Sequence, residues 1–135
     1  MKYITFAVPC YNSESYMRRC VDSLLLGGKD VEIILVNDGS VDRTAQIADE
    51  YQMIYPDIVR VVHKKNGGHG SGVNKGLELA RGLYYKVVDS DDWLDADSYR
   101  ILLDTIRDMC GGGRCEFEEE IPDLFVCNYV YDHLE

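Results

Sequence analysis

The chain is organised around the acidic stretch Val87-Val88-Asp89-Ser90-Asp91-Asp92-Trp93-Leu94, which ends an apolar run that begins at Leu83. Three carboxylates lie within four residues, and two unit charges about 4 Å apart cost roughly 4 kcal/mol at an effective dielectric of ~20. Such a cluster is tolerated when it is solvated, shares a proton or holds a cation. A solvated acidic turn is the simplest interpretation. The position after a buried strand, and three polar clusters at equivalent places upstream, favour a binding site.

Composition bounds the class of protein. The chain has 135 residues, enough for one domain with one core, and its 46% hydrophobic and 28% charged residues are typical of a soluble globular protein. A formal net charge of -10 without a basic stripe argues against nucleic acid and anionic membranes as partners. A phosphate-bearing ligand stays open, because a divalent metal can reverse the local sign. We expect no membrane span and no signal peptide.

The cysteines indicate the redox compartment. They are odd in number and contain no C-x-x-C pair, so we expect reduced thiols in a cytoplasmic protein. Zinc or a disulfide between Cys110 and Cys115, which flank three glycines, is the less favoured alternative. The five cysteines are Cys10, Cys20, Cys110, Cys115 and Cys127.

Apolar segments of strand length alternate with segments of helical periodicity. This alternation predicts a doubly wound α/β fold, in which helices flank a mainly parallel sheet whose strands are buried on both faces. We expect residues 1–135 to form a single domain. The expected strands cover residues 3–8, 31–36, 58–62, 83–88 and 124–131.

The ends of these elements carry specific signals. Pro9 is expected to stop the first strand, because proline cannot donate a hydrogen bond to the ladder. Ser13 is the expected N-cap of the first helix, and Asp95 that of the fourth. Ser40 or Asp42 can cap the second helix. Helical spacing predicts these core-facing side chains: Met17, Cys20, Val21, Leu24 and Leu25 in the first helix, Ala45, Ile47, Ala48 and Tyr51 in the second, Val73, Leu77 and Ala80 in the third, and Tyr99, Leu102, Leu103 and Ile106 in the fourth.

Polar clusters follow four of the expected strands. The carboxyl ends of parallel strands meet along one edge of the sheet, where ligands bind in open α/β folds. One cluster alone would mean little, but four on one edge predict a binding cleft. The clusters are Pro9-Cys10-Tyr11-Asn12, Asn37-Asp38-Gly39-Ser40, the glycine-rich residues 66–76, and Asp89-Ser90-Asp91-Asp92.

The glycine-rich segment matches neither common phosphate-binding fingerprint. Its glycines do not fall in the G-x-G-x-x-G register, and no Gly-Lys-Ser/Thr follows at the spacing of a Walker A loop. Two interpretations stay open. The segment is either a flexible loop that feeds a helix, or a backbone that approaches a ligand closely and points free N–H groups at it.

The residue types in the predicted cleft suggest its chemistry. The ring of Tyr11 can stack, and the carboxylate of Asp38 suits a base with an N–H to donate. Asp91 and Asp92 suit a hard cation that keeps waters or takes phosphate oxygens, which would neutralise a diphosphate and stabilise it as a leaving group. Simple packing of Tyr11, and a turn in which Asp38 bonds its own backbone, are the alternatives for those two residues.

Four motifs in order resemble the family 2 inverting glycosyltransferases of the GT-A fold. They are Val8-Pro9-Cys10-Tyr11-Asn12, Val36-Asn37-Asp38-Gly39-Ser40-Val41-Asp42-Arg43-Thr44, Asn66-Gly67-Gly68 with Asn74-Lys75-Gly76, and Val88-Asp89-Ser90-Asp91-Asp92-Trp93-Leu94. The resemblance covers about residues 3 to 109. It implies a nucleotide-sugar donor, usually a UDP-sugar, a Mg²⁺ or Mn²⁺ ion, and a glycan or lipid-linked acceptor of unknown structure.

The resemblance also implies roles for individual residues. Pro9 and Tyr11 would line the base and ribose site, and Asp38 would accept a hydrogen bond from the base. Asp91 would lie at the ribose and the metal, and Asp92 would be the metal ligand. Asp89 is the first acidic residue of the motif, at a position whose function varies within the family. The other residues expected to bind the donor are Asn12, Gly68 and Asn74.

The resemblance ends before the expected acceptor site. Family members carry an acceptor-binding region and a catalytic base after the donor half, whereas Glu118, Glu119 and Glu120 precede the last expected strand and do not match that motif. We therefore assign no catalytic base and expect it beyond Glu135, with the chain truncated relative to a full enzyme. An Asp-dependent phosphohydrolase or phosphoacceptor domain, and a non-catalytic nucleotide-binding module, are the alternatives.

Overall fold

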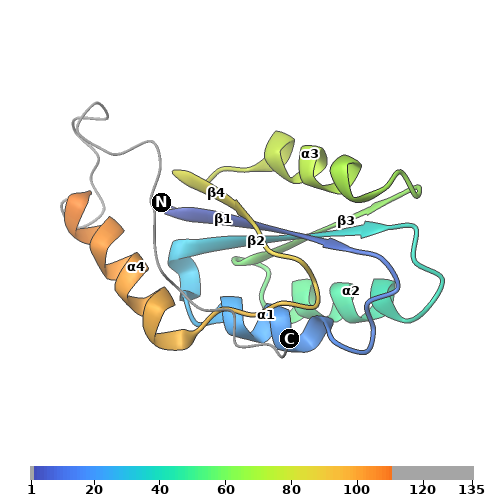
Figure 1. Cartoon of the computed structure of the whole chain (residues 1–135), viewed down its shortest axis with the longest axis horizontal. Helices are drawn as coiled ribbons and strands as arrows, with labels where there is room; N and C mark the ends of the chain where they lie inside the picture. Colours follow the sequence, from blue (N-terminus) through green and yellow to red (C-terminus); the bar gives the residue numbers. More distant parts are fainter. Residues whose placement is uncertain (1, 111–135) are drawn as a thin grey trace.

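The computed structural model describes residues 2–110, which form a parallel sheet covered by helices (Figure 1). β1 runs through the middle, with β2 on one side and β4 on the other, and β3 lies outside β2. The predicted parallel sheet is confirmed. Every residue of β1 and β2 is buried, as predicted, whereas β4 and most of β3 are only half-buried. The strands are β1 (Ile4–Cys10), β2 (Val31–Asp38), β3 (Val59–Lys64) and β4 (Tyr84–Val87).

Helices cover both faces of the sheet (Figure 1). α1 (Met17–Leu25) and α2 (Thr44–Ile54) lie on one face, and α3 (His69–Leu79) lies on the other. A short 3-10 helix (Gly28–Asp30) leads into β2. Successive strands move from β1 to β2 to β3 in one direction, and the chain then crosses to β4 on the far side of β1. This reversal between β1 and β4 is the topological switch point at which open α/β sheets bind ligands.

α4 (Ala96–Met109) packs on the side of the sheet that carries α1. The ring of Tyr99 meets the ring of Phe6 edge to face, with 5.5 Å between the centroids, and its hydroxyl donates to the carbonyl of Leu24 at 2.8 Å. Asp95 caps the helix by accepting a hydrogen bond from the backbone N–H of Ser98 at 2.9 Å, as predicted. The core-facing residues predicted for α4 are confirmed: Tyr99, Leu102, Leu103 and Ile106.

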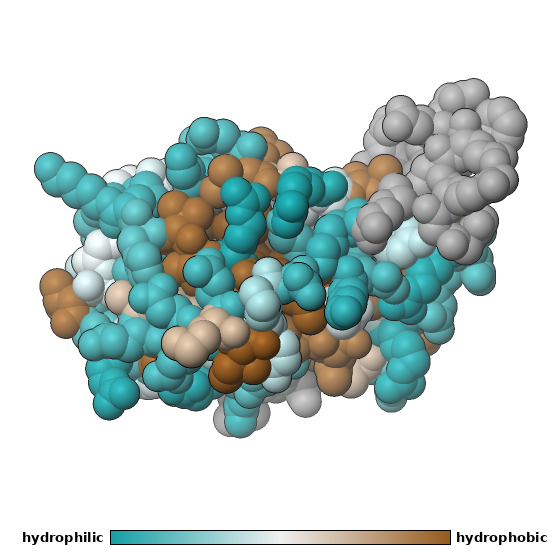
Figure 2. Space-filling view, turned by 180° about the vertical axis from the view of Figure 1, so that it is seen from behind, coloured by the Kyte–Doolittle hydropathy of each residue, from teal (hydrophilic) through white to brown (hydrophobic). Residues whose placement is uncertain are grey.

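The predicted inward faces of α1 and α2 are also largely confirmed. Met17, Cys20, Val21 and Leu24 are buried, whereas Leu25 is half-buried. In α2, Ile47, Ala48 and Tyr51 are buried, together with Thr44 in place of the half-buried Ala45. Seen from behind, hydrophilic side chains cover much of the surface, with smaller hydrophobic groups between them (Figure 2).

Three predictions about the ends and faces of elements are wrong. Pro9 does not stop β1, which continues to Cys10 and pairs Pro9 with Val36. The carbonyl of Ala7 accepts from Val88 on the β4 side, and the nitrogen of Pro9 faces the same side and cannot donate, so the pairing with β4 ends there. β1 continues past Pro9 because its other side still pairs with β2.

Ser13 does not cap α1, because Tyr16 holds the cap position without a side-chain bond. The Ser13 hydroxyl instead accepts from the backbone N–H of Tyr11 at 3.1 Å. Arg43, also without a side-chain bond, holds the cap position of α2. Asp42 nevertheless accepts from the N–H of Thr44 at 2.9 Å at the start of that helix.

α3 packs on the sheet through glycines and not through the predicted Val73, Leu77 and Ala80. Gly72 and Gly76 are its buried residues, whereas Leu77 is exposed. A Cβ on Gly76 would lie 2.6 Å from the Cβ of Ala7, so only glycine permits this close approach of helix to strand.

Cys10, Cys20 and Cys110 are buried, and Cys10 and Cys20 are free thiols. The cytoplasmic location inferred from the cysteines stays a prediction. None of the helices within residues 2–110 combines the length and the apolar character that crossing a membrane requires. The expected strand at 124–131, the glutamate run, Cys115 and Cys127 lie outside the described residues.

Candidate active site

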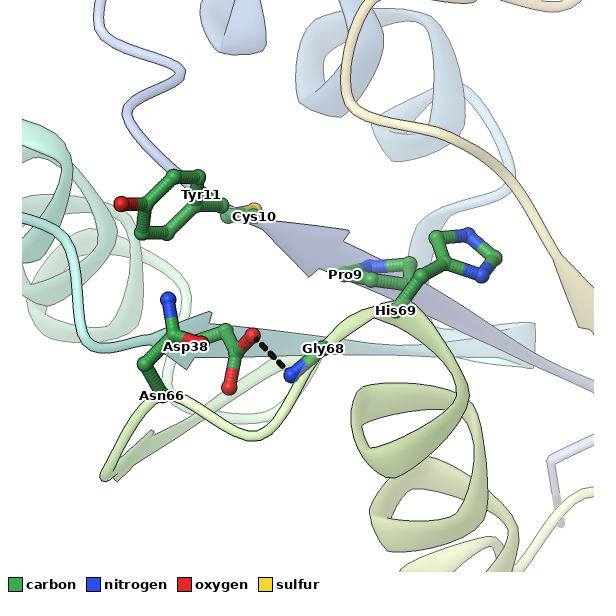
Figure 3. Close-up of a pocket in the computed structure, with 7 residues that line it drawn as sticks. All are labelled: Pro9, Cys10, Tyr11, Asp38, Asn66, Gly68 and His69. Atoms are coloured by element: carbon green, nitrogen blue, oxygen red, sulfur yellow. Dashed lines mark hydrogen bonds between the residues drawn. The ribbon is translucent and has the colours of Figure 1, made fainter.

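A pocket of about 380 Å³ opens where β1 and β2 end (Figure 3). Its walls come from the end of β1, the end of β2 and the loop that enters α3. The edge predicted from the polar clusters is thus the edge that carries a pocket. The lining residues are Pro9, Cys10, Tyr11, Asp38, Asn66, Gly68 and His69.

Asp38, the last residue of β2, is 4% exposed. Its Oδ1 accepts from the ammonium of Lys64 at 2.7 Å and from the N–H of Gly67 at 2.8 Å, and its Oδ2 accepts from the N–H of Gly68 at 2.9 Å. Burial alone raises the pKa of Asp38, but these hydrogen bonds outweigh it and hold the pKa below the ordinary value. Asp38 is therefore an ionised acceptor that faces the pocket.

Tyr11 and Pro9 form the side of the pocket that comes from β1 (Figure 3). The ring of Tyr11 is 52% exposed, so its face is open to a ligand and the packing alternative is not favoured. Cys10 is buried between them, and burial raises the pKa of its thiol to about 12. This thiol is therefore not a nucleophile at neutral pH.

Asn12 lies in the loop behind Tyr11 and joins two loops of the edge. Its φ of 48° is in the left-handed region, which asparagine tolerates. Its side-chain oxygen accepts from the N–H of Val41 at 2.9 Å, and its own N–H donates to the hydroxyl of Ser40 at 3.0 Å. The structure thus gives Asn12 a bracing contact, and its part in donor binding stays a prediction.

Gly68 begins the turn into α3 and aims its N–H at Asp38. Its φ of 92° is strained for a residue with a side chain, so glycine is required there. The glycine-rich segment lines the pocket, but the N–H groups of Gly67 and Gly68 donate to Asp38, so close approach to a ligand through free N–H groups stays a prediction. Asn74 is exposed on α3, two residues from both inward glycines and thus on the opposite side of the helix. The structure does not bring Asn74 into the pocket.

Asp89, Asp91 and Asp92 form the acidic cluster next to this pocket. Each offers a carboxylate oxygen, and these oxygens lie within 4.8 Å of one another. The donor set fits a hard divalent cation, which takes oxygen ligands and completes its shell with water or phosphate. The cluster adjoins the pocket because the Nε2 of His69 lies 2.8 Å from the Oδ1 of Asp89.

Two contacts that the sequence did not reveal hold the acidic cluster in place. Ser90 is buried between its exposed neighbours, and its hydroxyl shares a hydrogen bond of 2.8 Å with the buried hydroxyl of Ser13. Beyond the cluster, the guanidinium of Arg19 lies 4.3 Å from the centre of the Trp93 ring. Small polar residues at strand ends gave no signal, since their partners are distant in sequence.

Comparison with known proteins identifies the family. The family model of glycosyl transferase family 2 matches residues 5–115. The putative glycosyltransferase EpsH of Bacillus subtilis is 39% identical over 128 residues, which are 94% of this chain and 33% of EpsH. The crystal structure of S. aureus TarS 1-349 in complex with UDP has a TM-score of 0.69 at 29% identity, covering 80% of this chain and 32% of that chain.

The complex of TarS 1-349 with UDP-GlcNAc gives a TM-score of 0.68 at 32% identity, over the same 80% of this chain and 32% of that one. The chain thus spans about a third of the length of EpsH and of TarS 1-349. Because the family match covers most of the chain and the described strands and helices follow the same fold, this protein belongs to glycosyl transferase family 2 and has the GT-A fold.

Proposed function

We propose that this chain is the donor-binding part of a glycosyltransferase that takes a sugar from a UDP-sugar and transfers it to an acceptor hydroxyl with inversion. The observation that carries the proposal is the convergence of Tyr11, Asp38 and the acidic cluster on one edge of the sheet. The TarS complexes with UDP and UDP-GlcNAc support a uridine nucleotide.

The pocket supplies the groups that a nucleoside requires. The exposed ring of Tyr11 offers a stacking face, and Pro9 continues this apolar wall. Asp38 accepts a hydrogen bond from the base through its Oδ2, which accepts from Gly68 alone, whereas Oδ1 already accepts two hydrogen bonds. Gly68 brings its backbone close to the ribose. Asn12, which belongs to the same motif as Pro9 and Tyr11, completes the proposed donor-binding set, whereas Asn74 lies outside the pocket and is not assigned to it.

Asp91 and Asp92 are the proposed metal ligands, with Asp91 also at the ribose. When bound, Mg²⁺ or Mn²⁺ would neutralise the diphosphate and stabilise it as a leaving group. Ser90 keeps the two carboxylates together through its bond to Ser13. The catalytic base, which would take the proton of the acceptor hydroxyl, is not assigned to any residue of this chain.

Thermal unfolding with UDP and Mn²⁺ tests donor binding. UDP at ~100 times its dissociation constant is expected to add about 2.7 kcal/mol to the free energy of unfolding. Asp92→Asn is expected to remove the metal-dependent part of this stabilisation. Asp108→Asn, at an exposed acid of α4 outside the cluster, is the matched control and is expected to keep it.

The absence of a metal-dependent shift with any nucleoside diphosphate would contradict the proposal. Release of free UDP from UDP-glucose, UDP-galactose or UDP-N-acetylglucosamine by this chain would argue against a non-catalytic binding module. No observation on the described residues favours the Asp-dependent phosphohydrolase. Phosphorylation of the chain by acetyl phosphate would favour that alternative.

A further inference from the structure

The hydrogen bonds of Asp38 leave one acceptor position open. A carboxylate oxygen accepts two hydrogen bonds in its plane. Oδ1 already accepts from Lys64 and Gly67, whereas Oδ2 accepts only from Gly68. The side chain is 6% exposed and lines the pocket, so the open position of Oδ2 is available to a ligand more than to bulk water.

Lys64 is fixed in its place opposite this carboxylate. It is the last residue of β3 and pairs with Asp38 in the parallel ladder between β2 and β3. Its side chain is 19% exposed, and its ammonium donates both to Asp38 and to the carbonyl of Lys65, each at 2.7 Å. A largely buried cation at this distance stabilises the ionised carboxylate, which can only accept hydrogen bonds.

We propose that Lys64 is a positioning residue that sets the base selectivity of the nucleotide site. By keeping Asp38 ionised and filling Oδ1, it leaves a single acceptor aimed at the base. Uracil has a hydrogen on N3 and can donate it to this acceptor. Cytosine has a lone pair on N3, which the carboxylate repels, and its neighbouring amino group finds no second open acceptor because Lys64 and Gly67 fill Oδ1. UDP is therefore preferred over CDP, a nucleotide of the same size. The inference rests on the proposed function, since it names what the donor site selects.

Lys64 and the backbone N–H groups of Gly67 and Gly68 all favour the ionised form of Asp38, but among these three partners Lys64 is the one that carries a charge. The pocket also holds the titratable side chains of Cys10, Tyr11 and His69, but the hydrogen bonds to Asp38 come from Lys64 and from backbone N–H groups. Those N–H groups remain when Lys64 is replaced. Removal of the cation therefore isolates the contribution of its charge.

The test measures the dissociation constants of UDP and CDP, each with Mn²⁺, by calorimetry. The unaltered chain is expected to prefer UDP about 10- to 100-fold, the range expected when a buried charged acceptor is left unpaired. Lys64→Met is expected to reduce this preference to about threefold or less, because the position on Oδ1 that Lys64 vacates can then accept from the amino group of cytosine. As the pH is lowered, the affinity of Lys64→Met for UDP is also expected to fall at a higher pH than that of the unaltered chain, because loss of the cation raises the pKa of Asp38.

Two further variants separate charge from structure. Lys64→Arg keeps a cation and is expected to retain the preference for UDP. Lys65→Met, at the exposed neighbour, is the matched control and is expected to behave like the unaltered chain. UDP methylated at N3 has no hydrogen to donate and is expected to bind the unaltered chain as weakly as CDP.

Several outcomes would overturn the inference. Equal affinities of the unaltered chain for UDP and CDP would overturn it, and this result does not depend on whether any variant folds. A Lys64→Met chain that folds and keeps the full preference for UDP would also overturn it. If no nucleoside diphosphate binds with Mn²⁺, the proposed function fails, and this inference fails with it. If UDP and CDP both bind with equal affinity, the inference alone fails.

Discussion

Two buried acids lie near opposite ends of β2, and their hydrogen bonds indicate different roles. Glu32 is 1% exposed, and three hydrogen bonds from Thr5 and Arg81 reach its two oxygens. Its Oε2 also forms ion pairs with Arg81 at 2.7 Å and with Arg60 at 3.9 Å. Asp38, at the edge that carries the pocket, accepts three and keeps one position open. A fully paired acid away from the pocket points to stability, whereas the acid with spare capacity points to binding.

Glu32→Gln is expected to lower the free energy of unfolding by about 1–3 kcal/mol, because the bonds from Arg81 lose their charged acceptor. Urea unfolding at pH 7 measures this change. Arg81 is largely exposed and can be solvated, which keeps the loss below that of a fully buried pair. An unchanged urea midpoint would contradict the role assigned to Glu32.

The same variant has a defined pH dependence. Burial alone raises the pKa of Glu32, but the hydrogen bonds from Arg81 and Thr5 hold it below the ordinary value. A pKa lowered by folding contributes stability above the unfolded value of ~4.3 and loses it as pH falls through the folded value. The gap between the unaltered chain and Glu32→Gln is thus expected to shrink below about pH 4. A gap that stays constant down to pH 3 would contradict this reasoning.

At the scale of elements, the glycines of α3 bring the pocket loop against the sheet. The hydroxyl of Tyr85 lies 2.8 Å from the Cβ that Gly76 lacks, and it donates to the carbonyl of Val73 at 2.7 Å. The loop that supplies Gly68 to the pocket leads directly into this helix. Close packing of α3 on β1 therefore fixes one wall of the pocket.

Gly76→Ala is expected to destabilise the protein by about 1–3 kcal/mol, because the added methyl would overlap Ala7 and Tyr85. Gly70→Ala in the same helix has nothing within 4 Å of the added atom. It is expected to stabilise by about 0.5–1 kcal/mol through helix propensity. Thermal unfolding of both variants checks the pair, and similar effects of the two changes would contradict the packing described for α3.

The sequence allowed the existence and order of the described elements to be predicted, because strand length and helical spacing are local properties. The face of α3 could not be predicted, since hydrophobic spacing favours Val73 and Leu77 and takes no account of close backbone approach. The prediction that Pro9 ends β1 was wrong for a similar reason, because it considered the local sequence alone. Whether Pro9 ends a strand depends on whether the other side of that strand still pairs with β2, which is a tertiary property.

At the scale of the whole molecule, the edge that carries the pocket was predictable and its inner contacts were not. Tyr11, Asp38 and the acidic cluster follow strand ends, so parallel topology alone brings them to one edge. Ser13 and Ser90 are 77 residues apart, and Lys64 and Asp38 are 26 apart. Such pairings follow from the register of the folded chain and have no local signature.

The net charge of -10 gives the proposed cation a role beyond the acidic cluster. A nucleoside diphosphate is itself an anion and approaches a chain of net negative charge, whose surface is largely hydrophilic on the face shown in Figure 2. A divalent ion at the cluster reverses the local sign, so that the diphosphate meets a positive site. The molecule as a whole therefore favours metal-dependent over metal-independent binding of the nucleotide.

Paramagnetic broadening by Mn²⁺ in the presence of UDP tests most directly whether these segments surround one ligand. We expect the backbone amide signals of residues 89–94 to broaden first. UDP is expected to shift the signals of Tyr11, Gly67 and Gly68, while Asp108 on α4 stays unchanged. Broadening centred away from the acidic cluster, or UDP shifts that leave Tyr11 and Gly68 unaffected, would contradict a single nucleotide site at this edge of the sheet.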